Sequence, residues 1–402
     1  MKKIAALVLA LVLCLTAAAA LADGIAKENI KLGIITLHDE QSTYDKNFID
    51  SARRAAANLG LREDQVIIVS GIPESDECRQ KALDLADEGC NIIFADSFGH
   101  EDFLIEAAKE YENVTFAHAT GTKAHVAGQA NFHNAFASIY EGRYLAGVAA
   151  GLKLNELKEA GKLKGSVPMI GYVGAFTYAE VISGYTSFYL GAKSVCPDVI
   201  MKVQFTGSWY DEMGEKAAAE ALINAGADLI SQHADSMGAP RACEDAGIPN
   251  VSYNGSTVEA CPTTFIVASL IDWAPYFEYL VNQTIAGEPV AVDWTGTIET
   301  GSVKLTDINE AAAAAGTAAK LEEVKAGLLD GTIRVFDTAK DGFITVGGEK
   351  MEESWKPGEG TDGAFAEGTK IVYDGFFHES EYRSAPYFDA TIDGIELLNS
   401  AF

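Results

Sequence analysis

Short apolar segments rich in β-branched residues alternate with segments of helical periodicity from residue 30 onward. Within 44–59, for example, Phe48, Ala52, Ala55 and Leu59 recur at the spacing of one helix face. The pattern predicts strands at 30–36, 65–70, 91–96 and 114–118, with helices at 44–59, 76–88 and 100–111. This βαβαβαβ order is typical of a parallel sheet covered by helices on both faces.

The same alternation repeats after residue 137. It predicts helices at 137–154, 179–194, 212–225 and 239–246, and strands at 169–173, 199–205, 228–232 and 251–253. Two α/β lobes of similar size therefore follow one another. A lone strand at 265–269 and a helix at 273–285 come next, and such an isolated unit suggests that the chain crosses back to the first lobe.

These patterns divide the chain into four folded parts. We expect 28–136 to form the N-terminal part of lobe 1 and 137–256 to form lobe 2. The segment 257–290 is expected to return to lobe 1, and 291–402 to be a partly irregular C-terminal segment packed mainly on lobe 2. Within that segment, 294–305 alternates like antiparallel strands and 308–329 is an Ala-rich predicted helix.

The first 22 residues have the features of a signal peptide. Lys2 and Lys3 precede an apolar stretch at 4–15 that is too short to span a bilayer, and an A-x-A cleavage site ends at Ala22. Cys14 lacks the small preceding residue of a lipobox, which favours a soluble exported protein over a lipid-anchored one. We expect a periplasmic or cell-surface location.

The charge balance narrows the possible partners. The chain carries 30 basic and 58 acidic residues, a formal net charge of −28. A nucleic-acid backbone or an anionic membrane surface would repel such a protein. Nucleic acid is therefore not an expected partner.

The cysteines give no sign of a metal or redox centre, because no C-x-x-C pair is present. Cys78 and Cys90 flank one predicted helix and would lie about 18 Å apart, too far to bridge. Cys243 and Cys261 could form a disulfide or remain buried thiols. We expect no cofactor and no metal.

Candidate binding residues follow the predicted strands, because ligands of doubly wound sheets sit beyond the carboxyl ends of the strands. The candidates are Tyr44, Phe98, Gly99, Phe176, Glu180, Trp209, Asp235, Asn254, Asp272 and Trp273. Rings stack on flat ligands, while carboxylates and amides bond their polar edges. The set therefore suits a planar, nitrogen-rich compound, for which stacking contributes about 1–3 kcal/mol per base.

Structural roles remain open for most of these candidates. Core packing is the alternative for Tyr44, Phe98 and Phe176. A role at a helix start or in a local turn is the alternative for Glu180, Asp235, Asn254 and Asp272. The histidines His38, His100 and His233 lack metal-ligand spacing and are expected to be polar lining.

Catalytic signatures are absent from the sequence. It contains no G-x-S-x-G, no H-E-x-x-H, no Walker A motif and no G-x-G-x-x-G after the first strand. Ser97 stands near His100, which is weak evidence for a nucleophile. We therefore predict that the protein is not an enzyme.

Several motifs, taken in order, resemble the basic membrane protein (BMP, PnrA-like) family of ABC-transporter substrate-binding proteins. They lie at 33–35, 94–99, 141–147, 174–184, 232–236 and 273–277. The resemblance covers roughly 28–336. It implies an α/β, type I periplasmic-binding-protein fold, with two doubly wound parallel-sheet lobes joined by a hinge.

The family also implies capture of purine nucleosides or nucleobases for an ABC permease. By this resemblance, Tyr44 with Phe176 or Trp209 would sandwich the ring, and Asp235, Glu180 and Asn254 would bond its edge. Phe98 and Gly99 would present a ring and a backbone group.

We expect a monomer that buries its ligand by hinge closure. The alternatives are a binder of a sugar or other small solute, a sensory ligand-binding protein, and an exported nucleoside-processing enzyme.

Overall fold

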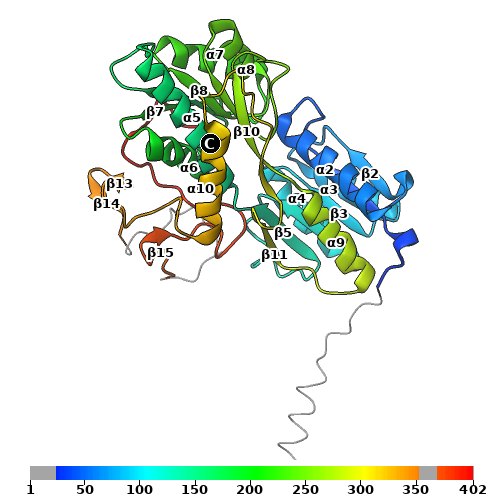
Figure 1. Cartoon of the computed structure of the whole chain (residues 1–402). Coiled ribbons are helices and arrows are strands. Elements are labelled where there is room, and N and C mark those ends of the chain that lie inside the picture. The colour runs from blue at the N-terminus through cyan, green and yellow to red at the C-terminus, as the bar shows by residue number, and fades with distance from the viewer. Residues whose placement is uncertain (1–23, 353–368, 402) are drawn as a thin grey trace, which may run out of the picture.

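The computed structural model describes residues 24–352 and 369–401 and contains two α/β lobes (Figure 1). The predicted signal peptide at 1–22 lies outside the described residues, as does part of the C-terminal segment. No helix among the described residues is long and apolar enough to cross a membrane.

Lobe 1 is built on a parallel sheet of strand order β11-β5-β4-β3-β1-β2. Its strands are β1 (Leu32–Ile35), β2 (Val66–Val69), β3 (Ile92–Ala95), β4 (Thr115–Ala119), β5 (Phe132–Ala137) and β11 (Asp293–Gly296). Every residue of β1, β3 and β5 is buried, as expected for strands covered on both faces. This double burial explains why β1 and β3 read as unbroken apolar runs, whereas β5 carries the buried polar residues His133 and Asn134 and was not predicted as a strand.

Lobe 2 is built on a sheet of order β12-β10-β9-β8-β6-β7-β17, parallel except where β12 meets β10. Its strands are β6 (Met169–Gly174), β7 (Ile200–Phe205), β8 (Leu229–His233), β9 (Asn250–Tyr253), β10 (Phe265–Ile271), β12 (Val303–Leu305) and β17 (Ile395–Leu397). The C-terminal β17 thus completes one edge of this sheet.

Helices cover both sheets. Lobe 1 has α2 (Thr43–Leu59), α3 (Asp76–Asp87), α4 (Glu101–Glu110) and α9 (Ala274–Ala286), with short 3-10 turns η1 (Lys27–Asn29), η2 (Glu63–Gln65) and η3 (Phe98–His100). Lobe 2 has α5 (Ile139–Glu159), α6 (Ala179–Val195), α7 (Glu212–Asn224), α8 (Gly238–Ala246) and α10 (Thr317–Asp330). Helix α2 begins where the Ser42 hydroxyl accepts from the Asp45 N–H, and it ends at Gly60 in the left-handed conformation.

Helices α5 and α6 pack at close range through a reciprocal pair of glycines. A Cβ at Gly147 would lie 1.9 Å from the Phe188 carbonyl oxygen, and one at Gly191 would lie 2.0 Å from that of Tyr144. Neither position accepts a side chain without separating the helices.

The chain crosses between the lobes three times, from β5 to α5, from β10 to α9 and from β11 to β12. The prediction that the whole segment 257–290 returns to lobe 1 is wrong for its strand, β10, which belongs to lobe 2. β10 pairs with β9 and stays in the lobe-2 sheet, and only α9 returns, where it packs on α2. Both lobes would accept an apolar strand, so the pattern alone does not decide the pairing.

Two further expectations for the C-terminal part are corrected. The strands within 294–305 do not pair with each other, because β11 joins β5 in lobe 1 and β12 joins β10 in lobe 2. The Ala-rich helix begins only at Thr317, not at 308. Gly316 adopts a left-handed φ of 81°, and Ala312 to Ala314 are buried against lobe 2 rather than wound into the helix.

The C-terminal segment completes the lobe-2 core. The rings of Phe336 and Phe388 stack with centroids 4.4 Å apart, and Phe343, Phe377 and Tyr387 are buried in the same cluster. Small hairpins are formed by β13 (Thr345–Val346) with β14 (Glu349–Lys350) and by β15 (Val372–Tyr373) with β16 (Phe376–Phe377).

All five cysteines that follow the predicted signal peptide are buried and free, so no disulfide joins Cys243 to Cys261 in this structure.

Candidate functional site

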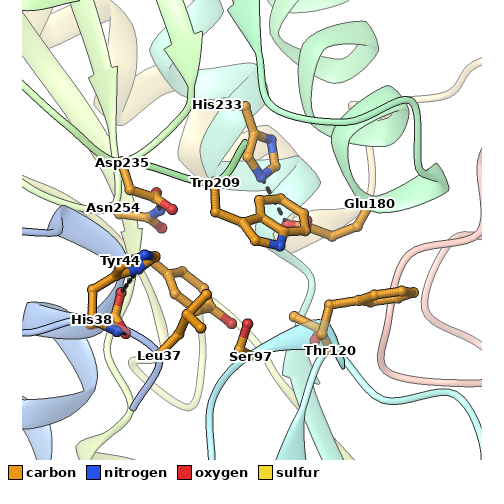
Figure 2. Close-up of a pocket in the computed structure, with 12 residues that line it drawn as sticks. Leu37, His38, Tyr44, Ser97, Thr120, Glu180, Trp209, His233, Asp235 and Asn254 are labelled. Atoms are coloured by element: carbon orange, nitrogen blue, oxygen red, sulfur yellow. Dashed lines mark hydrogen bonds and ion pairs between the residues drawn. The ribbon is translucent and has the colours of Figure 1, made fainter. Parts of the chain in front are cut away.

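A pocket lies where the carboxyl ends of the two sheets face each other (Figure 2). Lobe 1 lines it with Leu37, His38, Tyr44, Asp45, Ser97, Phe98 and Thr120, and lobe 2 lines it with Glu180, Trp209, His233, Asp235 and Asn254. The pocket region holds about 370 Å³ of space not filled by atoms, part of which is open to solvent. Loops after β1, β3, β4, β7, β8 and β9 therefore converge on one place, as the doubly wound topology requires.

Two aromatic rings lie on opposite sides of the pocket. Figure 2 shows the Trp209 indole on the lobe-2 side and the Tyr44 ring on the lobe-1 side. The Tyr44 hydroxyl donates to the Asp96 carbonyl oxygen at 2.8 Å, and Phe176 packs edge-on against Trp209 at 4.9 Å. Both rings are therefore held in place before any ligand enters, which favours a flat ligand.

A carboxyl and an amide lie together at one end of the pocket. The Asn254 Nδ2 donates to Asp235 Oδ1 at 3.1 Å, and both side chains are almost fully buried. Asn254 has a left-handed φ of 66°, a conformation that asparagine tolerates better than most residues. Burial, with a smaller contribution from the charge of Asp45, raises the pKa of Asp235 well above its ordinary value. A protonated carboxyl can both donate to and accept from a ligand edge.

A second carboxylate lies at the other end, where Glu180 Oε1 is 3.2 Å from His233 Nε2. Glu180 sits in the first turn of α6, where a negative charge is stabilised by the helix dipole. The pocket is therefore lined by two separate hydrogen-bonding groups of lobe 2, Asp235 with Asn254 and Glu180 with His233.

Asp45 on the lobe-1 side is occupied by its own loop. It accepts from the His38 N–H at 2.7 Å and from the Ser42 hydroxyl at 2.5 Å, and the His38 Nδ1 lies 3.4 Å away. Burial acts to raise the pKa of Asp45, but the hydrogen bonds from His38 and Ser42 outweigh it and the net pKa is lowered. Asp45 therefore fixes the loop after β1 as an ionised group.

Contacts between the lobes close the pocket. The Thr43 N–H donates to the Asp235 carbonyl oxygen at 3.0 Å. The Phe98 ring of lobe 1 stacks on the Tyr178 ring of lobe 2 with centroids 5.0 Å apart. The structure therefore represents the closed arrangement of the two lobes.

Six of the ten predicted site residues line this pocket. They are Tyr44, Phe98, Glu180, Trp209, Asp235 and Asn254. Phe176 does not line it and instead supports Trp209 from behind. Gly99 is also outside the lining. Its N–H donates to Glu74 Oε1 at 2.8 Å, and a Cβ at Gly99 would lie 2.6 Å from the Glu74 carboxyl carbon, so this glycine positions the Phe98 loop.

Asp272 and Trp273 lie away from the pocket. Asp272 pairs with Arg54 and with Lys304 Nζ, the latter at 2.6 Å, and accepts from the Ala274 N–H at the start of α9. Trp273 is buried in the lobe-1 core and stacks on Phe48 at 4.4 Å. Both follow β10, whose end faces the crossing between the lobes rather than the pocket.

Four lining residues escaped the sequence-based selection: Leu37, Asp45, Ser97 and Thr120. Leu37 and Ser97 directly follow predicted strands, and Thr120 lies two residues after the predicted strand at 114–118, so the strand-end rule could have included them. Asp45 is instead hidden inside a helical pattern. His38 and His233 line the pocket as predicted. His100 does not, because it is buried in lobe 1, where its Nε2 bonds to the Ile72 carbonyl oxygen at 2.9 Å.

A metal centre is not built into the part of the chain that the structure describes. There, no three side chains of His, Cys, Asp or Glu are grouped so that they could hold an ion.

Comparisons with known proteins find relatives that are named as binding proteins for small molecules. The chain is 34% identical over 255 residues to a purine-binding protein of Brucella abortus, covering 63% of this chain and 68% of the relative. It is 32% identical over 211 residues to a candidate glucose-binding protein of an ABC transporter from Haloferax volcanii, covering 52% of this chain and half of that relative.

Solved structures support the fold. A solute-binding protein of an ABC transporter system from Aeropyrum pernix matches with a TM-score of 0.64 at 18% identity, covering 78% of this chain and 94% of that protein. The family model described as ABC transporter substrate-binding protein, PnrA-like, matches residues 33–329. This match spans both lobes and every residue that lines the pocket. The chain therefore belongs to the PnrA-like (Bmp) family of ABC transporter substrate-binding proteins.

Proposed function

We propose that this chain captures a purine nucleobase or nucleoside between its lobes and delivers it to the permease of an ABC importer. Its family consists of extracytoplasmic binding subunits rather than enzymes. The ligand class and the monomeric state are our proposals.

One observation carries the choice of ligand: the Trp209 and Tyr44 rings line one pocket from the two lobes, and the carboxyl groups of Asp235 and Glu180 line it as well. A purine has two faces for stacking and a rim of ring nitrogens and exocyclic groups for hydrogen bonds. Asp235 with Asn254 would bond one edge, and Glu180 would accept from the opposite edge. Stacking between the rings would add about 1–3 kcal/mol.

Binding would be coupled to lobe closure. Residues of both lobes line the pocket, so neither lobe alone presents the complete site. The apparent affinity would therefore include the fraction of molecules able to close. The purine-binding relative supports this ligand class, while the glucose-binding name of another relative keeps a sugar as the competing candidate.

A thermal-shift panel tests the proposal. Adenine, guanine, adenosine and inosine would be compared with glucose and ribose on the same preparation. A ligand at about 100 times its Kd adds roughly 2.7 kcal/mol to the free energy of unfolding. We expect stabilisation by at least one purine compound and none by the sugars. Stabilisation by glucose alone would refute the proposed ligand class and leave the binding-protein assignment intact.

A further inference from the structure

Glu215 is a fully buried carboxylate whose hydrogen bonds all go to two loops. It lies in the first turn of α7, and its side chain is completely inaccessible to solvent. Its Oε1 accepts from the Asp211 N–H at 3.1 Å, and its two oxygens lie 3.3 and 3.2 Å from the Ser236 N–H. No ion pair to Glu215 occurs within the residues that the structure describes. Burial raises the pKa of Glu215 to about 7, and hydrogen bonds from the Ser236 side chain and from the Asp211 and Ser236 N–H groups oppose that rise.

The two loops that Glu215 joins are those that carry ligand contacts of lobe 2. Asp211 ends the loop that follows β7 and bears Trp209, and Ser236 directly follows Asp235 after β8. The Asp235 N–H also donates to the Trp209 carbonyl oxygen at 3.0 Å. One buried side chain therefore sits where the stacking ring and the edge-bonding carboxyl are tied together.

We propose that Glu215 is a positioning residue of the binding site, which sets the distance between Trp209 and Asp235 by clamping their loops together. It does not line the pocket and would not touch the ligand. The inference rests on the proposed binding site, but it requires only that a ligand contact Trp209 and Asp235.

The chemistry favours a positioning role over simple helix stabilisation. Burying a carboxylate costs free energy unless its oxygens accept hydrogen bonds. The Glu215 oxygens accept theirs from the two pocket loops. An acid at a helix start ordinarily lies at the surface, where the dipole already favours it. Glu215 instead gives its acceptors to loops that would otherwise be joined by one backbone hydrogen bond. Such support behind the contacting residues is what holds a site to its working geometry.

The chain offers a matched control in Asp228. This carboxylate is also buried in lobe 2 and also accepts from two backbone N–H groups, those of Lys164 at 2.7 Å and Met169 at 3.0 Å. It precedes β8 and therefore lies at the opposite end of the strand from Asp235. Glu215→Ala and Asp228→Ala remove similar interactions, but only the first acts on the pocket loops.

The experiment compares the parent protein with Glu215→Ala, Glu215→Gln and Asp228→Ala in the full chain. Adenine affinity is measured by calorimetry, and hydrogen exchange is followed in peptides that cover 206–211 and 233–236. We expect Glu215→Ala to weaken adenine binding at least about tenfold and Asp228→Ala less than about twofold. Both peptides should exchange faster in Glu215→Ala only. Glu215→Gln keeps one acceptor oxygen and should restore part of the affinity.

Equal changes in adenine affinity for Glu215→Ala and Asp228→Ala would overturn the proposal, as would unchanged exchange in the two peptides of Glu215→Ala. If Glu215→Ala does not fold, the Glu215→Gln variant decides. Hydrogen exchange and adenine affinity equal to those of the parent would then show that the second carboxylate oxygen is not needed to hold the two loops, and the proposal would be wrong. If the parent fails to bind adenine, adenine is not its ligand and the affinity comparison moves to the purine that stabilises it in the thermal-shift panel, while the exchange data still decide the role of Glu215.

Discussion

On the lobe-1 wall of the pocket, Asp45 already accepts hydrogen bonds from the His38 N–H and the Ser42 hydroxyl. On the lobe-2 wall, Asp235 has one hydrogen-bond partner among the described side chains, the Asn254 amide. Tyr44 of lobe 1 likewise uses its hydroxyl on the Asp96 carbonyl oxygen. The two walls therefore differ in how much hydrogen-bonding capacity they leave for a ligand.

This difference assigns separate roles to the lobes. Lobe 2 places two carboxyl groups in the pocket, Asp235 beside Asn254 and Glu180 beside His233, so it would recognise the ligand and hold it first. Lobe 1 offers mainly ring faces and internally satisfied polar groups, so it would act as the cover that completes burial. Lobe 2 would then supply most of the binding energy, and the contacts between the lobes would set the rate of ligand release.

The largest effect should come from the carboxyl of lobe 2. Asp235→Ala removes the edge contact and leaves the Asn254 amide without its partner, and a buried polar group left unsatisfied costs about 1–3 kcal/mol. We expect adenine affinity, measured by calorimetry, to fall about 10- to 100-fold. Asp45→Ala should cost stability but much less affinity. An equal loss of affinity in both variants would remove the proposed division of roles.

The stacking ring of lobe 2 should follow. Trp209→Ala removes one face of the pocket, and we expect a loss of at least about 1 kcal/mol, or roughly fivefold in Kd. Trp273→Phe serves as the control, because Trp273 lies in the lobe-1 core. That variant should lower the melting temperature and leave Kd unchanged. An unchanged Kd in Trp209→Ala would exclude this ring from the ligand contact.

Contacts between the lobes should give a smaller effect that appears in the release rate. Tyr178 stacks on Phe98 across the lobes but does not line the pocket. Aromatic pairs contribute about 0.5–1.5 kcal/mol, so Tyr178→Ala should speed ligand dissociation about two- to tenfold in stopped-flow measurements. A double-mutant cycle with Phe98→Ala isolates the pair. Additive effects in that cycle would show that the stack does not stabilise closure.

The smallest effect is a contrast in pH dependence. Burial, and to a smaller degree the charge of Asp45, raises the pKa of Asp235 above 3.8 in the folded protein. Asp235 therefore does not lower the free energy of unfolding below pH 3.8, and it lowers that free energy increasingly as the pH rises toward the folded pKa. Asp45 has a lowered pKa, because hydrogen bonds outweigh burial. Its stabilisation is complete above pH 3.8 and is lost as the pH falls through the folded pKa.

Chemical denaturation between about pH 4 and 8 tests this contrast. Relative to the parent, Asp235→Asn should gain unfolding free energy as the pH rises, whereas Asp45→Asn should keep a constant deficit. A constant difference for Asp235→Asn would show that its carboxyl is ionised over the whole range in the folded protein.

Local patterns predicted the sheets well because most strands are buried on both faces and read as apolar runs, as in β3. They also located six pocket residues, because parallel strands end at one edge. They failed where the answer depends on distant pairing. The strand-end rule predicts Asp272 and Trp273 as site residues because they follow β10, but they lie at the crossing between the lobes and outside the pocket lining. Asp45 was missed because a helical pattern does not show which side chain turns toward the other lobe.

The pairing of the C-terminus with lobe 2 has a practical consequence. The Ala401 N–H donates to the Thr177 hydroxyl at 2.9 Å, and the Thr177 N–H donates to the Ala401 carbonyl oxygen at 2.7 Å, one residue from Phe176 and Tyr178. Ala401 therefore lies beside the loop that follows β6 and leads to Glu180 in the pocket lining. A fluorescent reporter attached there, paired with a dye on the Gly71 turn of lobe 1, would turn the protein into an optical sensor whose signal follows the opening and closing of its two halves.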